Sequence, residues 1–463
     1  GQNVSRGIGP MSWERPEIVA ATGRHVLVKE RDSAKYAVGD LEEFSNSNVI
    51  HTFTATAAAL WGNKVWKPAT AAGTVAAYDV KTKKTAAAVD TGSGCKPTAL
   101  QAVGRWIYWA CGGTKAGVFD QSLGKSVSVP AGGEPRLGDG FLVRATGDEL
   151  MVTDFSRGAA TKPATTLLAS GVEWGHGIGW AVDPFGGHVA HVDADQRIHV
   201  TEVPVPRSPV ASIESRVERN FVRAGGEEPW TGHWQLSRPA DAWKVTFTDV
   251  AKKTVATVSG TARSAASISA TWDGLATGGR KPQNGTHTWT VSVKAAGESS
   301  YVPVKTGTVE VSGGTAAYRD EQADGRGNVL TVNKNGTLTS HDFPATGVHD
   351  KWSRAGWHIK YTYVPFGDLT GDGCNDLLVR NTVGNLYRYD GVCGHPPAKT
   401  STRTSLGGGW EAYNVLTSPG DLTGDGLPDL LARKSSTGDI WVFPGTKAGK
   451  LGAGKKIRTG WSY

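Results

Sequence analysis

The sequence is built on a recurring strand–turn–strand unit, and this repeat limits the fold more than any other feature. Runs of β-branched and aromatic residues flank a turn that contains Gly, Asp or Asn, a pattern typical of antiparallel strands. The clearest copies are residues 138–155, 186–203, 327–343, 375–391 and 428–445, and looser copies are residues 17–54, 57–90 and 96–130. These units repeat at roughly 35–53 residues, which leaves room for about four short strands in each.

This period predicts an all-β fold, a β-propeller of seven or eight blades. A single small sheet cannot bury both of its faces, so stacking of successive units creates the core. Both blade numbers stay open because the two chain ends often complete one blade together. A β-solenoid or two stacked sandwiches is the alternative architecture.

The repeat is interrupted between residues 207 and 313, where strands are longer and alternate cleanly, as at 243–247 and 286–293. The interruption has the size of one Ig-like sandwich, about 100 residues. We therefore predict propeller blades in residues 15–206, an Ig-like insert in residues 207–313 and further blades in residues 314–463.

Charge and hydropathy exclude several classes of protein. The 463 residues carry 50 Lys and Arg against 43 Asp and Glu, but the basic residues are scattered and form no nucleic-acid module. No apolar run reaches the ~18 residues needed to span a membrane. The chain begins at Gly1 without an apolar leader, so we expect that an export signal has been removed.

The four cysteines form two local pairs, Cys95 with Cys111 and Cys374 with Cys393. Neither pair has the spacing of a zinc site. Two disulfides, each closing a loop of ~15–20 residues and contributing about 3 kcal/mol, would place the protein outside the cell. Four buried thiols in a reducing compartment are the alternative.

Two nine-residue acidic loops, residues 368–376 and 421–429, both begin Asp-Leu-Thr-Gly-Asp-Gly and precede a Leu-Leu strand. Ca²⁺ takes six to eight oxygen ligands, and Gly at position 6 permits the turn around the ion. Positions 1, 3, 5 and 9 offer side-chain oxygens and position 7 a backbone carbonyl. The predicted ligands are Asp368, Thr370, Asp372, Cys374 and Asp376 in one loop, and Asp421, Thr423, Asp425, Leu427 and Asp429 in the other.

A helical EF-hand is excluded because position 12, which should be Glu, is Val379 in one loop and Ala432 in the other. A solvated acidic turn is the simpler interpretation, but the repeated hexapeptide favours metal. A third, degenerate loop spans residues 320–328, where weaker Ca²⁺ binding, or none, is expected. Its ligand positions are Asp320, Gln322, Asp324 and Asn328.

Residues 316–463 resemble FG-GAP/VCBS repeats, the calcium-binding propeller blades also found in integrin α-chains. The segments that carry the resemblance are 356–357, 366–373, 385–391, 407–410, 418–426, 439–445 and 460–461. The resemblance implies a structural Ca²⁺ between the first two strands of a blade. Cys374 departs from the pattern at position 7, where a disulfide to Cys393 would pin the loop to the blade's outer edge.

The second half of the insert resembles the Ig-like domain family first described in the hook-capping protein FlgD, a spacer or interaction module. Trp272-Asp273-Gly274 and the segment 284–289 carry that resemblance. The whole arrangement is similar to actinobacterial secreted proteins that combine both elements. No catalytic residues are transferred from either family.

No catalytic motif stands out, so we expect a secreted, calcium-stabilised, non-catalytic protein that binds an extracellular protein, such as a protease or its inhibitor. A lectin or cell-wall carbohydrate binder, serving a toxin assembly in bacterial competition, is the alternative. A polysaccharide-cleaving enzyme using Asp183, Asp193 and Asp195 is the weakest hypothesis. A strand would place His188 and His191 on opposite faces, which is poor geometry for a shared metal.

The tryptophans predict core contacts more than sugar binding. Alternation in the strand at 106–109 puts Trp106 and Tyr108 on one face and Trp109 on the other. Four more tryptophans lie next to a glycine in predicted loops. Aromatic rings in loops can stack on sugar rings, so these four are the candidates for sugar binding. They are Trp174, Trp357, Trp410 and Trp461. Because Gly-Trp is part of the repeat itself, burial between blades is the favoured interpretation for them.

Overall fold

The computed structural model describes residues 16–41, 49–173, 179–249, 252–322, 325–343, 347, 349–392 and 395–461. These residues form an all-β protein with two short 3-10 turns, η1 (Gly158–Ala160) and η3 (Trp410–Ala412). None of these residues belongs to a helix with the length and apolarity that a bilayer crossing requires.

Five antiparallel sheets form the N-terminal group, in which each strand mostly pairs with the next along the chain. The first sheet contains β1 (Pro16–Thr22), β2 (His25–Glu30), β3 (Lys35–Asp40) and β4 (Val49–Thr54). The second contains β5 (Ala59–Trp61), β6 (Lys64–Pro68), β7 (Thr74–Asp79), β8 (Lys84–Thr85) and β9 (Val89–Asp90). The third contains β10 (Ala99–Val103), β11 (Trp106–Cys111), β12 (Lys115–Asp120) and β13 (Lys125–Val129). The fourth contains β14 (Arg136–Leu137), β15 (Phe141–Thr146), β16 (Glu149–Asp154) and β17 (Ala164–Ala169), and the fifth β18 (Trp180–Val182), β19 (His188–Val192) and β20 (Ile198–Glu202).

Three similar sheets form the C-terminal group. The first contains β27 (Val329–Val332), β28 (Leu338–Asp342) and β29 (His349–Arg354). The second contains β30 (Thr362–Gly367), β31 (Asp376–Arg380), β32 (Leu386–Tyr389) and β33 (Arg403–Ser405). The third contains β34 (Tyr413–Gly420), β35 (Asp429–Lys434), β36 (Ile440–Phe443) and β37 (Lys455–Arg458). All five clear repeat units of the sequence are confirmed, because each contains two adjacent paired strands.

Successive sheets stack face to face, and each interface holds its own apolar cluster. Leu27 and Val38 of the first sheet meet Leu60 and Val65 of the second. The third sheet contributes one face to each neighbour: Ile107 and Trp109 lie in the cluster with the second sheet, and Trp106 and Tyr108 in the cluster with the fourth. The predicted alternation of residues 106–109 is therefore confirmed.

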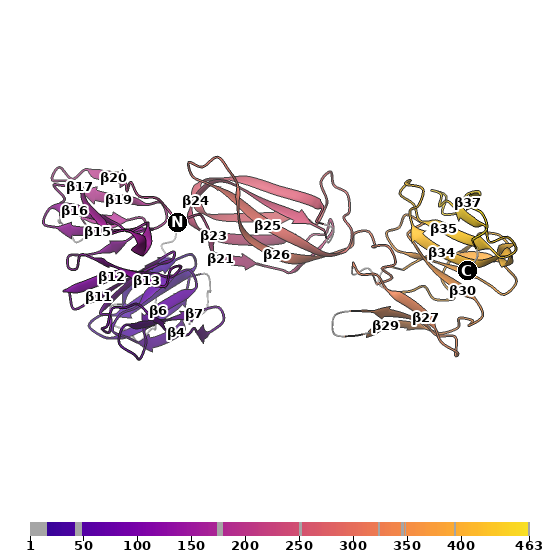
Figure 1. Cartoon of the computed structure of the whole chain (residues 1–463), viewed down its shortest axis with the longest axis horizontal. Coiled ribbons are helices and arrows are strands. Elements are labelled where there is room, and N and C mark those ends of the chain that lie inside the picture. The colour runs from indigo at the N-terminus through magenta and orange to yellow at the C-terminus, as the bar shows by residue number, and fades with distance from the viewer. Residues whose placement is uncertain are drawn as a thin grey trace.

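The Ig-like domain lies between the two groups (Figure 1). Its strands are β21 (Ser212–Val217), β22 (Phe221–Arg223), β23 (Trp230–Thr248), β24 (Thr254–Trp272), β25 (Gly285–Ala295) and β26 (Val302–Ser312). Its core is aromatic: Trp230, Trp234 and Phe247 are almost fully buried, and the rings of Phe247 and Trp272 stack with centroids 4.0 Å apart.

The two groups of sheets attach to opposite ends of this domain (Figure 1). At one end Ser208 donates from its backbone N–H and its hydroxyl to Asp139, at 2.7 Å each. At the other end the Ala316 N–H donates to the Gly373 carbonyl at 2.9 Å. The described residues of the two groups therefore do not meet in one ring, which differs from the expected propeller with an insert. The periodicity of strands predicts each sheet from neighbouring residues. It does not predict the direction in which the chain leaves the Ig-like domain, which decides whether the two groups of sheets can meet.

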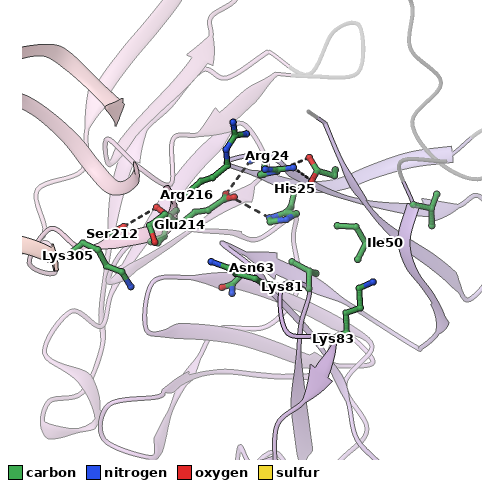
Figure 2. Close-up of a pocket in the computed structure, with 15 residues that line it drawn as sticks. Arg24, His25, Ile50, Asn63, Lys81, Lys83, Ser212, Glu214, Arg216 and Lys305 are labelled. Atoms are coloured by element: carbon green, nitrogen blue, oxygen red, sulfur yellow. Dashed lines mark hydrogen bonds and ion pairs between the residues drawn. The ribbon is translucent and has the colours of Figure 1, made fainter. Parts of the chain in front are cut away.

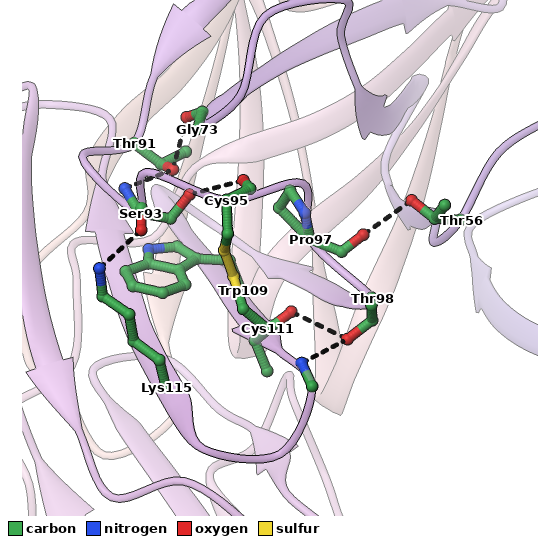
Figure 3. The surroundings of a disulfide bond; sticks show 12 residues. Thr56, Gly73, Thr91, Ser93, Cys95, Pro97, Thr98, Trp109, Cys111 and Lys115 are labelled. Atoms are coloured by element: carbon green, nitrogen blue, oxygen red, sulfur yellow. Dashed lines mark hydrogen bonds between the residues drawn. A yellow bond between two sulfur atoms is a disulfide. The ribbon is translucent and has the colours of Figure 1, made fainter.

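A disulfide joins Cys95 and Cys111, whose Cα atoms lie 6.4 Å apart, on the third sheet (Figure 3). The Thr98 N–H donates to the Ala110 carbonyl at 2.8 Å, and Lys115 Nζ donates to the Ser93 carbonyl at 2.7 Å. The loop before β10 is thus fastened to the hairpin β11–β12 both covalently and by hydrogen bonds. A disulfide indicates an oxidising environment.

Candidate functional site: three acidic loops of the C-terminal sheets

The two acidic loops occupy equivalent places. Residues 368–376 connect β30 to β31, and residues 421–429 connect β34 to β35. Both loops therefore join the first two strands of a sheet and turn back directly into a Leu-Leu strand. Gly373 and Gly426, at position 6, have φ of 87° in each case, a left-handed conformation that glycine adopts without strain.

The first loop is organised by its own backbone amides. Asp368 Oδ1 accepts a hydrogen bond from Gly371 N at 2.7 Å, and Oδ2 accepts one from Gly373 N at 2.8 Å. Asp376 Oδ2 accepts from Leu369 N and Thr370 N at 2.8 and 3.0 Å. The carboxylates at positions 1 and 9 therefore close the loop from both ends.

The second loop repeats these contacts. Asp421 Oδ1 accepts from Gly424 N at 2.7 Å, and Oδ2 accepts from Gly426 N at 2.8 Å. Asp429 Oδ2 accepts from Leu422 N and Thr423 N at 2.7 and 2.8 Å. Two segments 53 residues apart in the sequence thus share one hydrogen-bonded conformation, as their common hexapeptide predicts.

The degenerate loop keeps part of the same arrangement. Asp320 Oδ2 accepts from Gly325 N at 2.7 Å, the contact between positions 1 and 6. Asn328 Oδ1 accepts from Gln322 N at 3.2 Å, the contact between positions 9 and 3. Asp324, the predicted ligand at position 5, lies outside the described residues.

The degenerate loop lies against the first acidic loop. Asn375 Nδ2 donates to the Ala317 carbonyl at 2.7 Å, and Arg319 Nη2 reaches across to the Ser418 carbonyl at 2.8 Å, close to the second loop. Glu321 is only 4% exposed and lies close enough to Asp376 for their charges to interact. The structure therefore gathers all three predicted loops at one edge of the C-terminal group.

Burial sets the electrostatics of this edge. It raises the pKa of Asp376 to about 6, and the neighbouring Asp368 carboxylate adds to the rise. It also raises the pKa of Glu321 to about 8, with further contributions from the charges of Asp320 and Asp376. In the exposed second loop, the hydrogen bond from Gly426 N lowers the pKa of Asp421. Buried negative charge is thus costly near the first and third loops.

The donor set of the two regular loops suits a hard divalent cation. Asp372 Oδ1 and Asp425 Oδ1 each accept one backbone N–H, at 2.9 Å, while neither Oδ2 accepts a hydrogen bond from a described residue. Thr370 and Thr423 add hydroxyl oxygens. Among the described residues, however, no three His, Cys, Asp or Glu side chains converge as a metal site. The amide contacts direct Asp368 and Asp376, and their counterparts, toward the loop backbone.

Cys374, at position 7 of the first loop, is disulfide-bonded. Its expected partner, Cys393, lies outside the described residues. Leu427, the counterpart of Cys374 in the second loop, donates its N–H to Asp425 Oδ1, as Cys374 does to Asp372 Oδ1.

The candidate enzymatic carboxylates are engaged in a turn. Asp193 Oδ2 lies 2.7 Å from His199 Nε2, and this hydrogen bond lowers the pKa of Asp193. Asp195 pairs with Arg197 at 2.7 Å. A glycosidase needs one carboxyl whose pKa is raised so that it can donate a proton, whereas the contact with His199 lowers the pKa of Asp193.

The histidines and tryptophans are mostly structural. In β19, His191 pairs with Trp180 on the face toward the fourth sheet, and His188 points to the opposite face. Trp357 and Trp410 are buried in the clusters between the C-terminal sheets, as predicted. Trp461 is half exposed and lies against Arg458, and Trp174 lies outside the described residues.

Sequence reasoning missed Glu321, the buried carboxyl beside the first loop. It occupies position 2 of the degenerate loop, where the regular loops carry Leu369 and Leu422. The available signal was an acidic residue at a position where both regular loops carry leucine. In the first loop this leucine, Leu369, is buried, and a charge at a buried position is costly unless it has a partner or a role.

Residues 219–297 match the FlgD Ig-like domain family. The match begins before the second half of the insert, so it extends further than the resemblance read from the sequence. None of the curated proteins matches the chain.

Several solved structures show weak overall similarity. The extracellular domain of a one-component system from B. thetaiotaomicron is 9% identical, with 63% of this chain and 43% of that one covered and a TM-score of 0.26. The computationally designed Ika8 protein is 14% identical, with 69% and 78% covered and a TM-score of 0.27. PorZ, a surface component of the type-IX secretion system of Porphyromonas gingivalis, is 12% identical, with 95% and 66% covered and a TM-score of 0.26.

The chain spans less than half the length of the B. thetaiotaomicron domain, and at these scores the three structures carry no argument about function. The family match is confined to one region. The chain therefore contains a FlgD Ig-like domain, flanked by two groups of small antiparallel sheets.

Proposed function

We propose that this chain is a secreted, non-catalytic binding protein whose flanking sheets are propeller blades of the FG-GAP/VCBS kind, and that it recognises an extracellular protein. Calcium held by loops 368–376 and 421–429 stabilises the C-terminal blades. The actinobacterial secreted proteins of similar composition are the proposed relatives.

The observation that carries this proposal is the uncovered outer face of the fifth sheet. Strand pairing places Ala181, Ala190 and Val200 side by side, and Val192 beside Ile198. These five side chains, called the end face below, are all apolar. Ile198 is 74% exposed and Val200 is 66% exposed. Contiguous exposed apolar surface of this kind marks sites of protein association.

The position of the end face explains what it would bind. Each of the first four sheets packs against the next sheet along the chain. The inner face of the fifth sheet packs on the fourth through Trp180 and Val189. The outer face is where a further blade would stack. A partner that offers an apolar sheet face therefore completes the stack, and the rigid sheets hold the binding surface in place.

Retention of secreted proteins on the immobilised full chain tests this proposal. The variant I198S/V200S removes the apolar character of the end face, and L123S/V383S removes two exposed apolar side chains elsewhere, at 52% and 70% exposure. We expect wild type and the L123S/V383S control to retain the same protein and I198S/V200S to lose it. Equal retention by all three would contradict the proposal.

Further measurements distinguish a second copy of the chain from another protein as the partner of the end face, and they test the carbohydrate-binding and enzymatic alternatives. Light scattering after size exclusion shows whether the end face binds the sheets of residues 314–463 from a second copy, because I198S/V200S would then abolish a dimer. Binding to a glycan array that survives in I198S/V200S would favour the carbohydrate-binding alternative. Shortening of a polysaccharide by the wild-type chain would favour the enzyme.

A further inference from the structure

A cavity of about 610 Å³ lies where the first two sheets meet the Ig-like domain. Strands β2 and β3 and the turn after β7 line one side, and β21 lines the other (Figure 2). Glu214 of β21 crosses the boundary: its Oε2 accepts a hydrogen bond from Arg24 N at 3.3 Å and lies 3.9 Å from His25 Nδ1. The cavity is therefore built by two parts of the chain that are in direct contact.

The lining is strongly basic. Five lysine and arginine side chains and His25 face two carboxylates. Both carboxylates already have cationic or amide partners, since Asp40 accepts from Arg24 Nε at 2.9 Å and Glu214 contacts Arg24 and His25. Lys81, Lys83 and Lys305 form no ion pair with any residue that the structure describes. Their charges remain available to a ligand.

The two lysines on the blade side are held by a hydrogen-bonded turn. Asp79 Oδ1 accepts from Lys81 N and Thr82 N at 3.0 and 2.8 Å, and its Oδ2 accepts from Asn63 Nδ2 at 2.8 Å. Lys83 has φ of 57°, and its N–H donates to the Asp79 carbonyl at 2.8 Å. A fixed turn lowers the conformational entropy lost when the lysines bind a ligand.

His25 belongs to the wall of the cavity and already has a partner. It is 7% exposed, and its Nδ1 lies 3.9 Å from Glu214 Oε2, across the boundary between the first sheet and the Ig-like domain. The lysines are therefore the groups of the lining whose charge has no described counter-ion.

We propose that this cavity binds the phosphate or sulfate group of an anionic ligand, with Lys81 and Lys83 on one side and Lys305 on the other. Lysine ammonium groups bind phosphate as point charges, and several of them together favour an anion with two or more charges over a carboxylate. Because both sides contribute, a bound ligand also links the Ig-like domain to the first two sheets. The inference does not depend on the proposed protein partner.

Titration calorimetry of the full chain with inorganic pyrophosphate tests the assignment, with inorganic sulfate and acetate as separate arms. We expect saturable pyrophosphate binding that weakens as NaCl is raised, because screening reduces the attraction of exposed charges. Binding of both pyrophosphate and sulfate identifies a general oxyanion site, and binding of pyrophosphate alone identifies a site that needs the higher charge of a phosphorylated ligand. No binding of either, or equal binding of acetate, would overturn the proposal.

Variants locate the site. K81A/K83A should weaken pyrophosphate binding at least tenfold, and K305A, on the opposite wall, several-fold. The control K447A/K450A removes the same charge from an exposed turn near the C-terminus and should leave the affinity unchanged. All these lysines are exposed, so the melting temperature should stay constant. Equal weakening in the control, or unchanged binding in both K81A/K83A and K305A, would show that the cavity is not the site.

Discussion

At the scale of single residues, the acidic loops show how one side chain can serve a turn and a cation. Asp425 Oδ1 accepts the Leu427 N–H, while Oδ2 accepts no hydrogen bond from the described residues. The first oxygen suffices to shape the turn. The second is the atom that a metal would use.

The substitution D425N separates these two roles. Asparagine keeps the oxygen that accepts the Leu427 N–H but removes the charge. In EDTA we expect the melting temperature of D425N to equal that of wild type, because the turn is intact. In excess Ca²⁺ we expect D425N to lose the part of the stabilisation that comes from the second loop, which is about 2.7 kcal/mol for one site when the ion is at a hundred times its Kd. An equal gain in both proteins would exclude Asp425 as a ligand.

Glu321 gives the metal-free protein a pH dependence. Its pKa is raised to about 8 by burial and by Asp320 and Asp376, whereas in the unfolded chain it titrates at its ordinary value near 4.5. The folded state thus holds a proton that the unfolded state releases, so stability falls as the pH rises from about 4.5 to 8. The shift corresponds to at most roughly 5 kcal/mol.

The variant E321Q should remove the part of this dependence that Glu321 contributes, since its amide cannot ionise, whereas Asp376, with its pKa raised to about 6, contributes the remainder. Urea unfolding in EDTA at pH 5 and pH 8 measures it: wild type should be less stable at pH 8 than at pH 5, and E321Q should change much less. A wild-type protein that gains stability over this range would contradict the assignment.

At the scale of secondary structure elements, the sequence predicted strands well and their contacts less well. Each clear repeat unit contains the expected pair of strands, because alternation and turn residues are local signals. Trp–Gly pairing across strands was not foreseen. Trp109 lies opposite Gly117, Trp243 opposite Gly260 and Trp289 opposite Gly307, with each indole over the glycine. Such contacts depend on register and rotamer, which the pattern of one strand does not specify.

The substitution G117A should destabilise the third sheet. A Cβ at this position would meet the Trp109 ring and the Val127 carbonyl, so the indole would have to move. Overpacking of this kind costs about 1–3 kcal/mol. Urea unfolding of G117A measures the cost, and G327A, at a glycine with open space around its Cα, is the control. Equal stability of G117A and wild type would contradict the tight Trp–Gly contact.

The disulfide of the third sheet should contribute to the free energy of unfolding by an amount similar to the cost of G117A. Its loss in C95A/C111A releases a loop of ~15 residues and should lower the free energy of unfolding by about 3 kcal/mol. A reducing agent would also cleave the disulfide of Cys374. The matched comparison is therefore C374A/C393A, which removes Cys374 and its expected partner and leaves the third sheet intact. Proteolysis near residue 95 should increase in C95A/C111A alone. Unchanged stability of C95A/C111A would show that the hydrogen bonds around the loop suffice.

At the scale of the whole molecule, the Ig-like domain determines the architecture. The sequence predicted this domain and the sheets on both sides, and the family match at residues 219–297 supports the domain. The placement of the two groups at opposite ends of the Ig-like domain could not be predicted from the sequence. It depends on the positions in space at which the chain enters the domain, before β21, and leaves it, after β26. The end face is the consequence: the fifth sheet stacks on one neighbour, and no described part of the chain covers its other side.

Calcium titration calorimetry of the full chain, after dialysis against EDTA, tests the central claim most directly. The account predicts two saturable sites and a melting temperature that rises with Ca²⁺, because ligand binding to the folded state alone stabilises it. D372A should remove one site and D425A the other. Absence of calcium heat together with an unchanged melting temperature would contradict the account.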